Sequence, residues 1–79
     1  MTGALPFNVM HFARLLRRAG LAIGPGKVMT ALQALPEIDL GRREDVYWTL
    51  HAVFVERHAQ SDLFRLAFDR FWQTAAERA

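Results

Sequence analysis

The apolar residues of this chain recur every three or four positions, a spacing that predicts amphipathic helices along most of its length. No segment keeps the two-residue alternation that is typical of a half-buried strand. Glycine and proline are disfavoured inside helices, so they mark where one predicted helix ends and the next begins. These marks divide the chain into four predicted helices, over about residues 7–19, 25–35, 42–57 and 62–77.

The first two predicted helices each have one apolar side. The inward side of the helix over 7–19 is formed by Val9, Phe12, Leu15, Leu16 and Ala19, and the opposite, cationic side by His11, Arg14, Arg17 and Arg18. Gly20 is placed to end this helix in the left-handed conformation. Pro25 suits the first turn of the second helix, where its missing N–H costs nothing. The buried stripe of that helix is predicted to contain Val28, Met29, Leu32 and Leu35.

The last two predicted helices are more apolar. In the helix over 42–57, Trp48, His51 and Val55 extend the apolar arc well beyond one stripe. A helix that is apolar over most of its circumference is usually buried between neighbours. The helix over 62–77, which begins at Ser61 or Asp62, has an aromatic inner face of Phe64, Phe68, Phe71, Trp72 and Ala75. The sequence thus predicts an all-α, compact four-helix bundle-like domain with its third helix central.

The length and composition limit the possible classes of protein. A chain of 79 residues suffices for one small domain, here taken as 1–79. It has no cysteine and therefore no disulfide framework, and no apolar run approaches the roughly 20 residues of a membrane span. The first residues lack the basic and apolar regions of a signal peptide. We therefore expect a soluble cytoplasmic domain.

Large apolar side chains are more numerous than so small a domain can easily bury. Val, Ile, Leu, Met, Phe, Trp and Tyr make up 29 of the 79 residues. Small domains have a high ratio of surface to interior, so part of this set is expected to form an exposed patch. Such patches mark contact sites, which predicts that the chain is part of a larger protein or docks onto one.

Candidate catalytic chemistry is sparse. His51 and His58 are seven residues apart, whereas helical zinc ligands are three or four apart. A half-buried His51 beside Trp48 is the preferred interpretation. Ser61 is the only serine and lacks a nucleophile elbow, and the carboxylates of Glu44 and Asp45 point in different directions on a helix. We expect no enzyme activity, no metal and no cofactor.

The Gly24-Pro25-Gly26-Lys27 segment is similar to part of a phosphate-binding loop. Leu21 stands where such a loop requires its first glycine, and Val28 follows the lysine in place of Ser or Thr. The segment still places free N–H groups and a lysine at a predicted helix N-terminus. We interpret it as a structural turn, with a weak anion site as the alternative.

The arginines are the best candidates for recognition. Arg14, Arg17 and Arg18 form a stripe on the first predicted helix, and Arg42 and Arg43 open the third. The net charge of only +2 does not by itself indicate a nucleic-acid-binding protein. The first two helices suggest a helix-turn-helix, but their connection is long and the second helix carries no arginine. These features argue against nucleic-acid binding, which is kept as an alternative.

Several blocks of the chain resemble the start of CoxE-like von Willebrand factor A (vWA) proteins. They are residues 8–21, 23–28, 41–50 and 68–72, which include the Gly-Pro-Gly and Arg-Arg-Glu-Asp-Val-Tyr sequences. The resemblance implies an N-terminal helical region that precedes a vWA domain. The Asp-x-Ser-x-Ser metal site of that domain does not occur in these residues, so no ligand is carried over.

The resemblance also implies a partner, because the family is associated with MoxR-type AAA+ ATPases and with the maturation of metal centres such as that of carbon monoxide dehydrogenase. We therefore predict a non-catalytic adaptor domain that binds such an ATPase or packs on the remainder of its own vWA chain. The candidate partner-binding residues are Arg14, Arg17, Arg18, Arg42, Arg43, Met10 and Leu66. The alternatives are a nucleic-acid-binding module and a purely structural domain.

Overall fold

The computed structural model describes residues 5–78 and the side chains of residues 8–73. These residues form four α-helices: α1 (Leu5–Ala19), α2 (Pro25–Ala34), α3 (Arg43–Phe54) and α4 (Ser61–Arg78). Short 3-10 helices, η2 (Leu35–Glu37) and η3 (His58–Gln60), follow α2 and precede α4. No strand occurs among the residues that are described. The predicted all-α, four-helix fold is confirmed.

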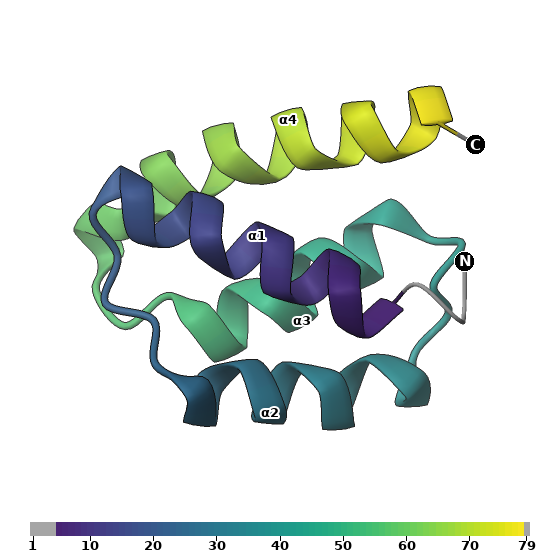
Figure 1. Ribbon diagram of the computed structural model, residues 1–79, viewed down its shortest axis with the longest axis horizontal. Helices are drawn as coiled ribbons and strands as arrows, with labels where there is room; N and C mark the ends of the chain where they lie inside the picture. Colours follow the sequence, from purple (N-terminus) through teal and green to yellow (C-terminus); the bar gives the residue numbers. More distant parts are fainter. Residues whose placement is uncertain (1–4, 79) are drawn as a thin grey trace.

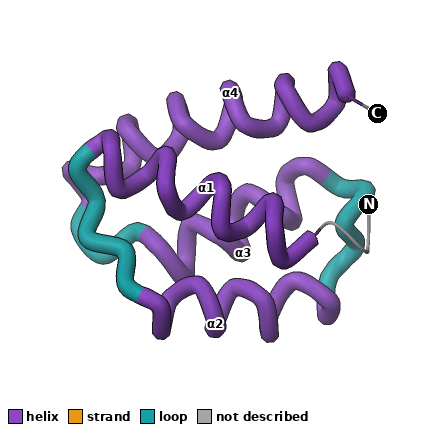
Figure 2. The backbone as a smooth tube through the Cα atoms, in the orientation of Figure 1, coloured by secondary structure: helices purple, strands orange, loops and turns teal. Residues whose placement is uncertain are grey.

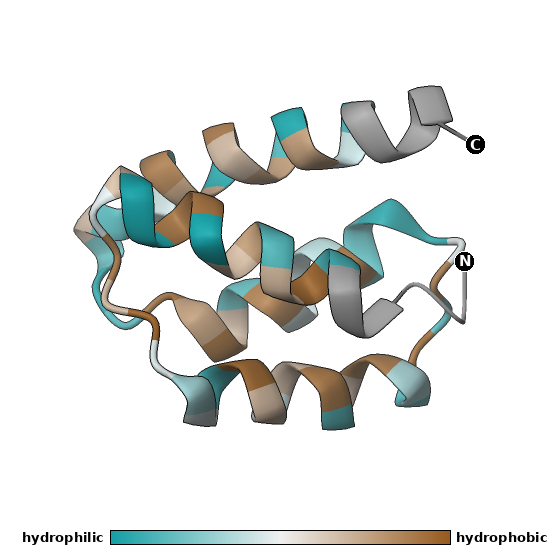
Figure 3. Cartoon of the chain, viewed as in Figure 1, coloured by the Kyte–Doolittle hydropathy of each residue, from teal (hydrophilic) through white to brown (hydrophobic). Residues whose placement is uncertain are grey.

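The helices run up and down beside one another. In Figure 1, α1 lies between α2 and α4, and α3 runs behind it. The α1–α2 and α3–α4 connections lie at one end of the domain, and the α2–α3 connection lies at the other (Figure 2). Hydrophobic and hydrophilic residues alternate around each helix, as amphipathic helices require (Figure 3). None of the described helices is both long enough and apolar enough to cross a bilayer.

The core is built around the ring of Phe12 in α1. The ring centroids of Phe54, Phe64, Phe68 and Phe71 lie 5.0 to 6.1 Å from that of Phe12. Most of these contacts are edge-to-face, which is a favourable geometry for aromatic pairs. One side chain of α1 therefore joins α3 and α4. The predicted inner face of α4 is found at Phe64, Phe68, Phe71 and Trp72, and Ala75 lies outside the residues whose side chains are described.

The third helix is less enclosed than its composition suggests. Val46, Leu50 and Phe54 are buried, but Trp48 is 59% exposed. At about 100° per residue, Trp48 lies about 160° from the centre of that buried stripe, on nearly the opposite side of the helix. The expectation that Trp48 extends the buried arc is therefore wrong, and the centre of the aromatic core is Phe12 of α1.

Gly20 ends α1 as predicted. Its φ of 111° is the only positive φ among the described residues. The N–H of Leu21 donates to the carbonyl of Leu16 at 3.0 Å, and the N–H of Gly20 donates to that of Arg17 at 3.1 Å. These two bonds make a Schellman motif. Leu16 and Leu21 occupy the two positions where apolar residues often accompany this motif, and both side chains are buried.

The third helix ends at Phe54, three residues before the predicted end, and side chains bond its last carbonyl and the N–H groups that follow it. The Nζ of Lys27, at the start of α2, lies 3.4 Å from the carbonyl oxygen of Phe54 and 2.7 Å from a carboxylate oxygen of Glu56. The side-chain oxygen of Gln60 accepts hydrogen bonds from the N–H groups of Glu56 and Arg57. A cation at a helix C-terminus also interacts favourably with the helix dipole.

Replacing Phe12 tests its central position. We expect Phe12→Ala to lower the free energy of unfolding by about 3–5 kcal/mol, because it removes a fully buried ring and leaves a cavity. Phe12→Leu should cost less, since it keeps much of the apolar volume. Urea unfolding followed by circular dichroism measures both, and a loss below about 1 kcal/mol for Phe12→Ala would contradict this packing.

Two glycine variants should have opposite effects. Gly20→Ala places a Cβ at a positive φ and should destabilise the domain by about 1–2 kcal/mol, although nothing lies within 4 Å of that Cβ. Gly26 lies inside α2, and a Cβ added there would also meet no atom within 4 Å. Gly26→Ala should therefore stabilise the domain by about 0.5–1 kcal/mol. Thermal unfolding of both variants checks the signs. Equal effects would contradict the conformational explanation for Gly20.

The Lys27–Glu56 pair should make stability depend on pH. The hydrogen bond and charge of Lys27 lower the pKa of Glu56 below its ordinary value of 4.5. A lowered folded-state pKa stabilises the fold above the ordinary value, and this contribution is lost as the pH falls through the folded-state pKa. Glu56→Gln should therefore reduce stability at about pH 7 and much less at about pH 3.

The exposed glutamate Glu37 lies outside this pair, so Glu37→Gln is the matched control. Urea midpoints at the two pH values measure the difference between each variant and the wild-type chain. A Glu56→Gln effect that did not shrink at low pH would exclude the ion pair as its cause.

Candidate partner-binding groove

An apolar groove of about 340 Å³ lies between α1 and α2. Its apolar lining comes from both helices and consists of Met10, Ala13, Pro25, Val28, Met29 and Leu32. On α1, these positions lie next to the core-facing stripe, about 100° around the helix from it. Ala13 is buried and lines the groove, so only a small side chain occupies this part of α1. The groove is therefore a hollow beside the core.

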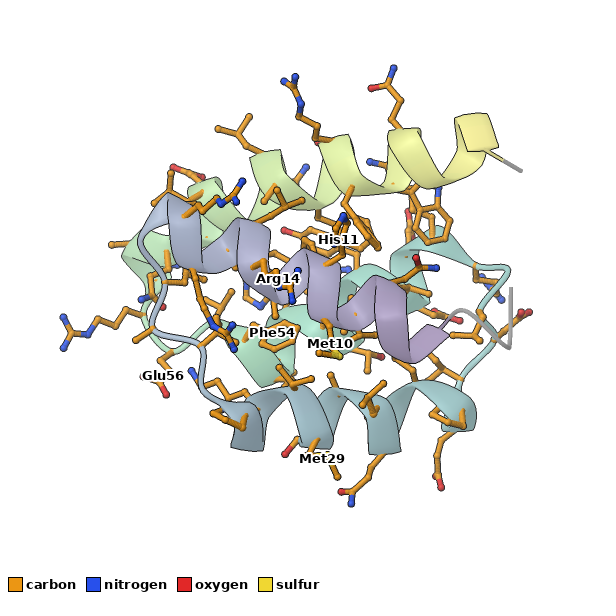
Figure 4. The ribbon with its side chains drawn as sticks, in the orientation of Figure 1. Met10, His11, Arg14, Met29, Phe54 and Glu56 are labelled. Atoms are coloured by element: carbon orange, nitrogen blue, oxygen red, sulfur yellow. The ribbon has the colours of Figure 1, made fainter. Side chains whose placement is uncertain are left out.

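Two methionines border the groove and are open to solvent. Met10 is 49% exposed and Met29 is 56% exposed. Figure 4 labels both and shows Met10 between α1 and α2. The prediction that Met29 lies in the buried stripe of the second helix is wrong. Ala31 is buried instead, and Val28 and Leu32 are half-buried against the core, so the packed face of α2 does not extend to Met29.

The α1 side of the groove is cationic. Arg14 and Arg17 both line it, and Arg14 is exposed. The Nε of Arg17 donates to the carbonyl oxygen of Ile23 at 2.6 Å, which holds this side chain along the α1–α2 connection. Arg14 forms no ion pair with any described residue. A charged group of a second molecule could therefore reach Arg14 without breaking an ion pair.

The other candidate arginines lie elsewhere. Arg42 pairs with Asp45 at 3.6 Å, within α3. Arg43 pairs with Asp69 of α4, and its guanidinium lies 5.8 Å from the ring centroid of Phe68. Neither lines the groove. Arg18 is exposed on α1 outside the groove lining. The predicted arginines are thus not one continuous surface.

Of the two predicted apolar contact residues, only Met10 belongs to the groove. Leu66 is 69% exposed, as its position among polar residues of α4 suggested, but it does not line the groove. The structure therefore brings Met10, Arg14 and Arg17 together and leaves Leu66, Arg42 and Arg43 apart from them.

Lys27 has an internal role. Its ammonium contacts the carboxylate of Glu56 and the last carbonyl of α3, so it is engaged within the fold. The Gly24-Pro25-Gly26 segment begins α2, with Gly24 in extended conformation at the N-cap. The interpretation of this segment as a structural turn agrees with these contacts, and the anion-site alternative no longer has a free lysine.

The histidines form no metal centre in the described part of the chain. His51 is half-buried, and its Nε2 lies 2.9 Å from the Oγ of Ser61. Its ring centroid lies 5.3 Å from that of Trp48, which agrees with the interpretation made from the sequence. The described residues contain no group of three or more His, Cys, Asp or Glu side chains that could hold a metal ion.

Two features of this surface were not predicted from the sequence. One is the contribution of α2: Val28, Met29 and Leu32 were predicted in the buried stripe, and although Val28 and Leu32 do pack against the core, all three also line the groove. The other is a separation of charge that the sequence displays plainly: all eight acidic residues lie at or after Glu37, so α1 and α2 have none. This separation is the signal in the sequence that distinguishes the first two helices as a cationic unit.

Comparison with known proteins identifies the family. The family model described as "CoxE N-terminal helical bundle domain" matches residues 9–75, which include the whole groove lining. No curated protein and no solved structure matches the chain significantly. The family's description as a helical bundle agrees with the four-helix fold. The chain therefore belongs to the CoxE N-terminal helical bundle domain family.

Proposed function

We propose that this chain is a non-catalytic protein-interaction domain of a CoxE-like vWA protein. In this proposal, residues 1–79 form one domain at the N-terminal end of a longer cytoplasmic chain. It acts as an adaptor for a MoxR-type AAA+ ATPase in the assembly or maturation of a metalloprotein complex. The observation that carries the proposal is the apolar groove between α1 and α2, with exposed methionines and a cationic side.

The character of the groove favours a protein over a nucleic acid. Six of its eight lining residues are apolar, and apolar contact surfaces with a few charged residues are typical of protein interfaces. A nucleic-acid-binding surface needs several cations free to meet phosphates. Lys27, Arg42 and Arg43 instead form ion pairs within the domain.

Capture of the ATPase by the tagged chain tests the proposal. The MoxR-type ATPase encoded in the same genome should be retained by the wild-type chain. Met29→Glu should reduce its retention at least about tenfold, because it places a carboxylate in an apolar contact surface. Leu66→Glu introduces the same carboxylate at an exposed apolar residue of α4 and should leave retention unchanged.

Other results would contradict parts of the proposal. Failure of the wild-type chain to retain the ATPase would exclude this partner. Equal losses for the Met29→Glu and Leu66→Glu variants would exclude the groove as the contact surface. Binding to duplex DNA that falls steeply with salt would favour the nucleic-acid alternative. Protection of the groove from hydrogen exchange only in the longer chain, with no ATPase retained, would favour a purely structural role.

A further inference from the structure

We infer that the groove between α1 and α2 receives one amphipathic helix of a partner protein, with acidic residues beside its apolar stripe. This inference rests on the proposed function as a protein-interaction domain and specifies the partner's chemistry. It depends on three properties of the described residues: the helical walls of the groove, its aliphatic lining, and the distribution of charge.

The walls of the groove favour a helical occupant. Both walls are α-helices, whose backbone N–H and C=O groups are bonded within each helix. An extended peptide that entered such a groove would find no strand edge with which to pair its own backbone groups. A helix satisfies these groups internally and presents only side chains. The 10 residues of α2 are about 15 Å long, which matches about three turns of an occupant helix.

The lining favours aliphatic side chains. Its apolar members are methionine, leucine, valine, alanine and proline, with no aromatic residue. Grooves that bind polyproline segments are lined by aromatic rings, so this one has the wrong lining for them. The flexible thioethers of Met10 and Met29 can repack around different apolar side chains. Apolar residues three and four apart on an occupant helix would meet such a surface.

The charges favour an acidic occupant. Arg14 and Arg17 line the groove, and neither wall helix contains an acidic residue. The Nε of Arg17 donates to the carbonyl oxygen of Ile23, but a guanidinium has five N–H donors, so this bond leaves other donors of Arg17 for an occupant. Arg14 forms no ion pair with a described residue. Carboxylates on the occupant would therefore meet available guanidinium groups, and basic residues there would be repelled.

Two fluorescent helical peptides test the inference against the 79-residue chain by anisotropy. Each peptide has about 18 residues with leucine at every third or fourth position. One carries glutamate on both sides of the leucine stripe, and the other carries glutamine at the same positions. The glutamate peptide should bind at least about tenfold more tightly than the glutamine peptide, because only it offers carboxylates to Arg14 and Arg17.

Charge variants of the domain locate this effect. Arg14→Glu should weaken binding of the glutamate peptide at least about tenfold and should leave the glutamine peptide within about twofold. Arg18→Glu makes the same charge change on the same helix outside the groove and should weaken the glutamate peptide by less than about threefold. Equal losses for Arg14→Glu and Arg18→Glu would show that the peptide responds to the overall charge of α1 and not to the groove, and would overturn the inference.

Apolar variants supply an independent readout. Met29→Ala should weaken both peptides about fivefold, whereas Leu66→Ala on α4 should change neither. Circular dichroism of each variant verifies that it is folded. The absence of binding by the glutamate peptide to the folded wild-type chain would overturn the inference.

The two proposals can fail separately. If the chain retains the ATPase through the groove and the glutamate peptide does not bind the folded chain, the inference is wrong while the proposed function stands. If the glutamate peptide binds the groove and the ATPase is not retained, the proposed ATPase partner is wrong while the inferred chemistry of the groove stands.

Discussion

The position of the Phe12 ring is the constraint on which the rest of this structure depends. Four phenylalanine rings from α3 and α4 lie around it, so one side of α1 must face those two helices. A helix that turns one side to the core fixes the direction of its other sides. The adjacent side of α1, with Met10, Ala13 and Arg14, then meets α2 and becomes one wall of the groove. The proposed partner-binding surface is thus a consequence of the core.

The charged side chains of this domain have two roles: some form ion pairs between helices, and others lie beside the groove. Lys27 links the start of α2 to the end of α3, and Arg43 links α3 to α4 through Asp69. Such partly exposed pairs add little stability individually, but they engage charged groups that otherwise would be available to a partner. What is left on α1 and α2 is a small cationic surface beside an apolar groove. This combination is suited to recognising one face of an acidic, amphipathic partner, which is the occupant inferred for the groove of this CoxE-family domain.

Much of the fold could be predicted from the sequence because it depends on local chemistry. The four helices, the left-handed end at Gly20, the aromatic side of α4 and the half-buried His51 all follow from residue spacing and backbone preferences. The candidate contact residues stay a prediction, because binding to a partner depends on what the other helices leave open. Met10, Arg14 and Arg17 lie on the groove, whereas Arg43 pairs with Asp69 of α4. Met29, predicted in the buried stripe of the second helix, is exposed instead.

The sequence by itself determined which residues share a side of each helix, since about 3.6 residues per turn places them there in any surroundings. Only the tertiary structure decided how many neighbours cover each side. Trp48 and Met29 are large hydrophobic residues, yet both are exposed, because none of the described helices packs over their sides. The tertiary structure also decided that Arg17 reaches the Ile23 carbonyl while Arg14 forms no ion pair among the described residues. The physical reason is that periodicity gives direction around one helix axis, whereas burial and pairing depend on the placement of the others.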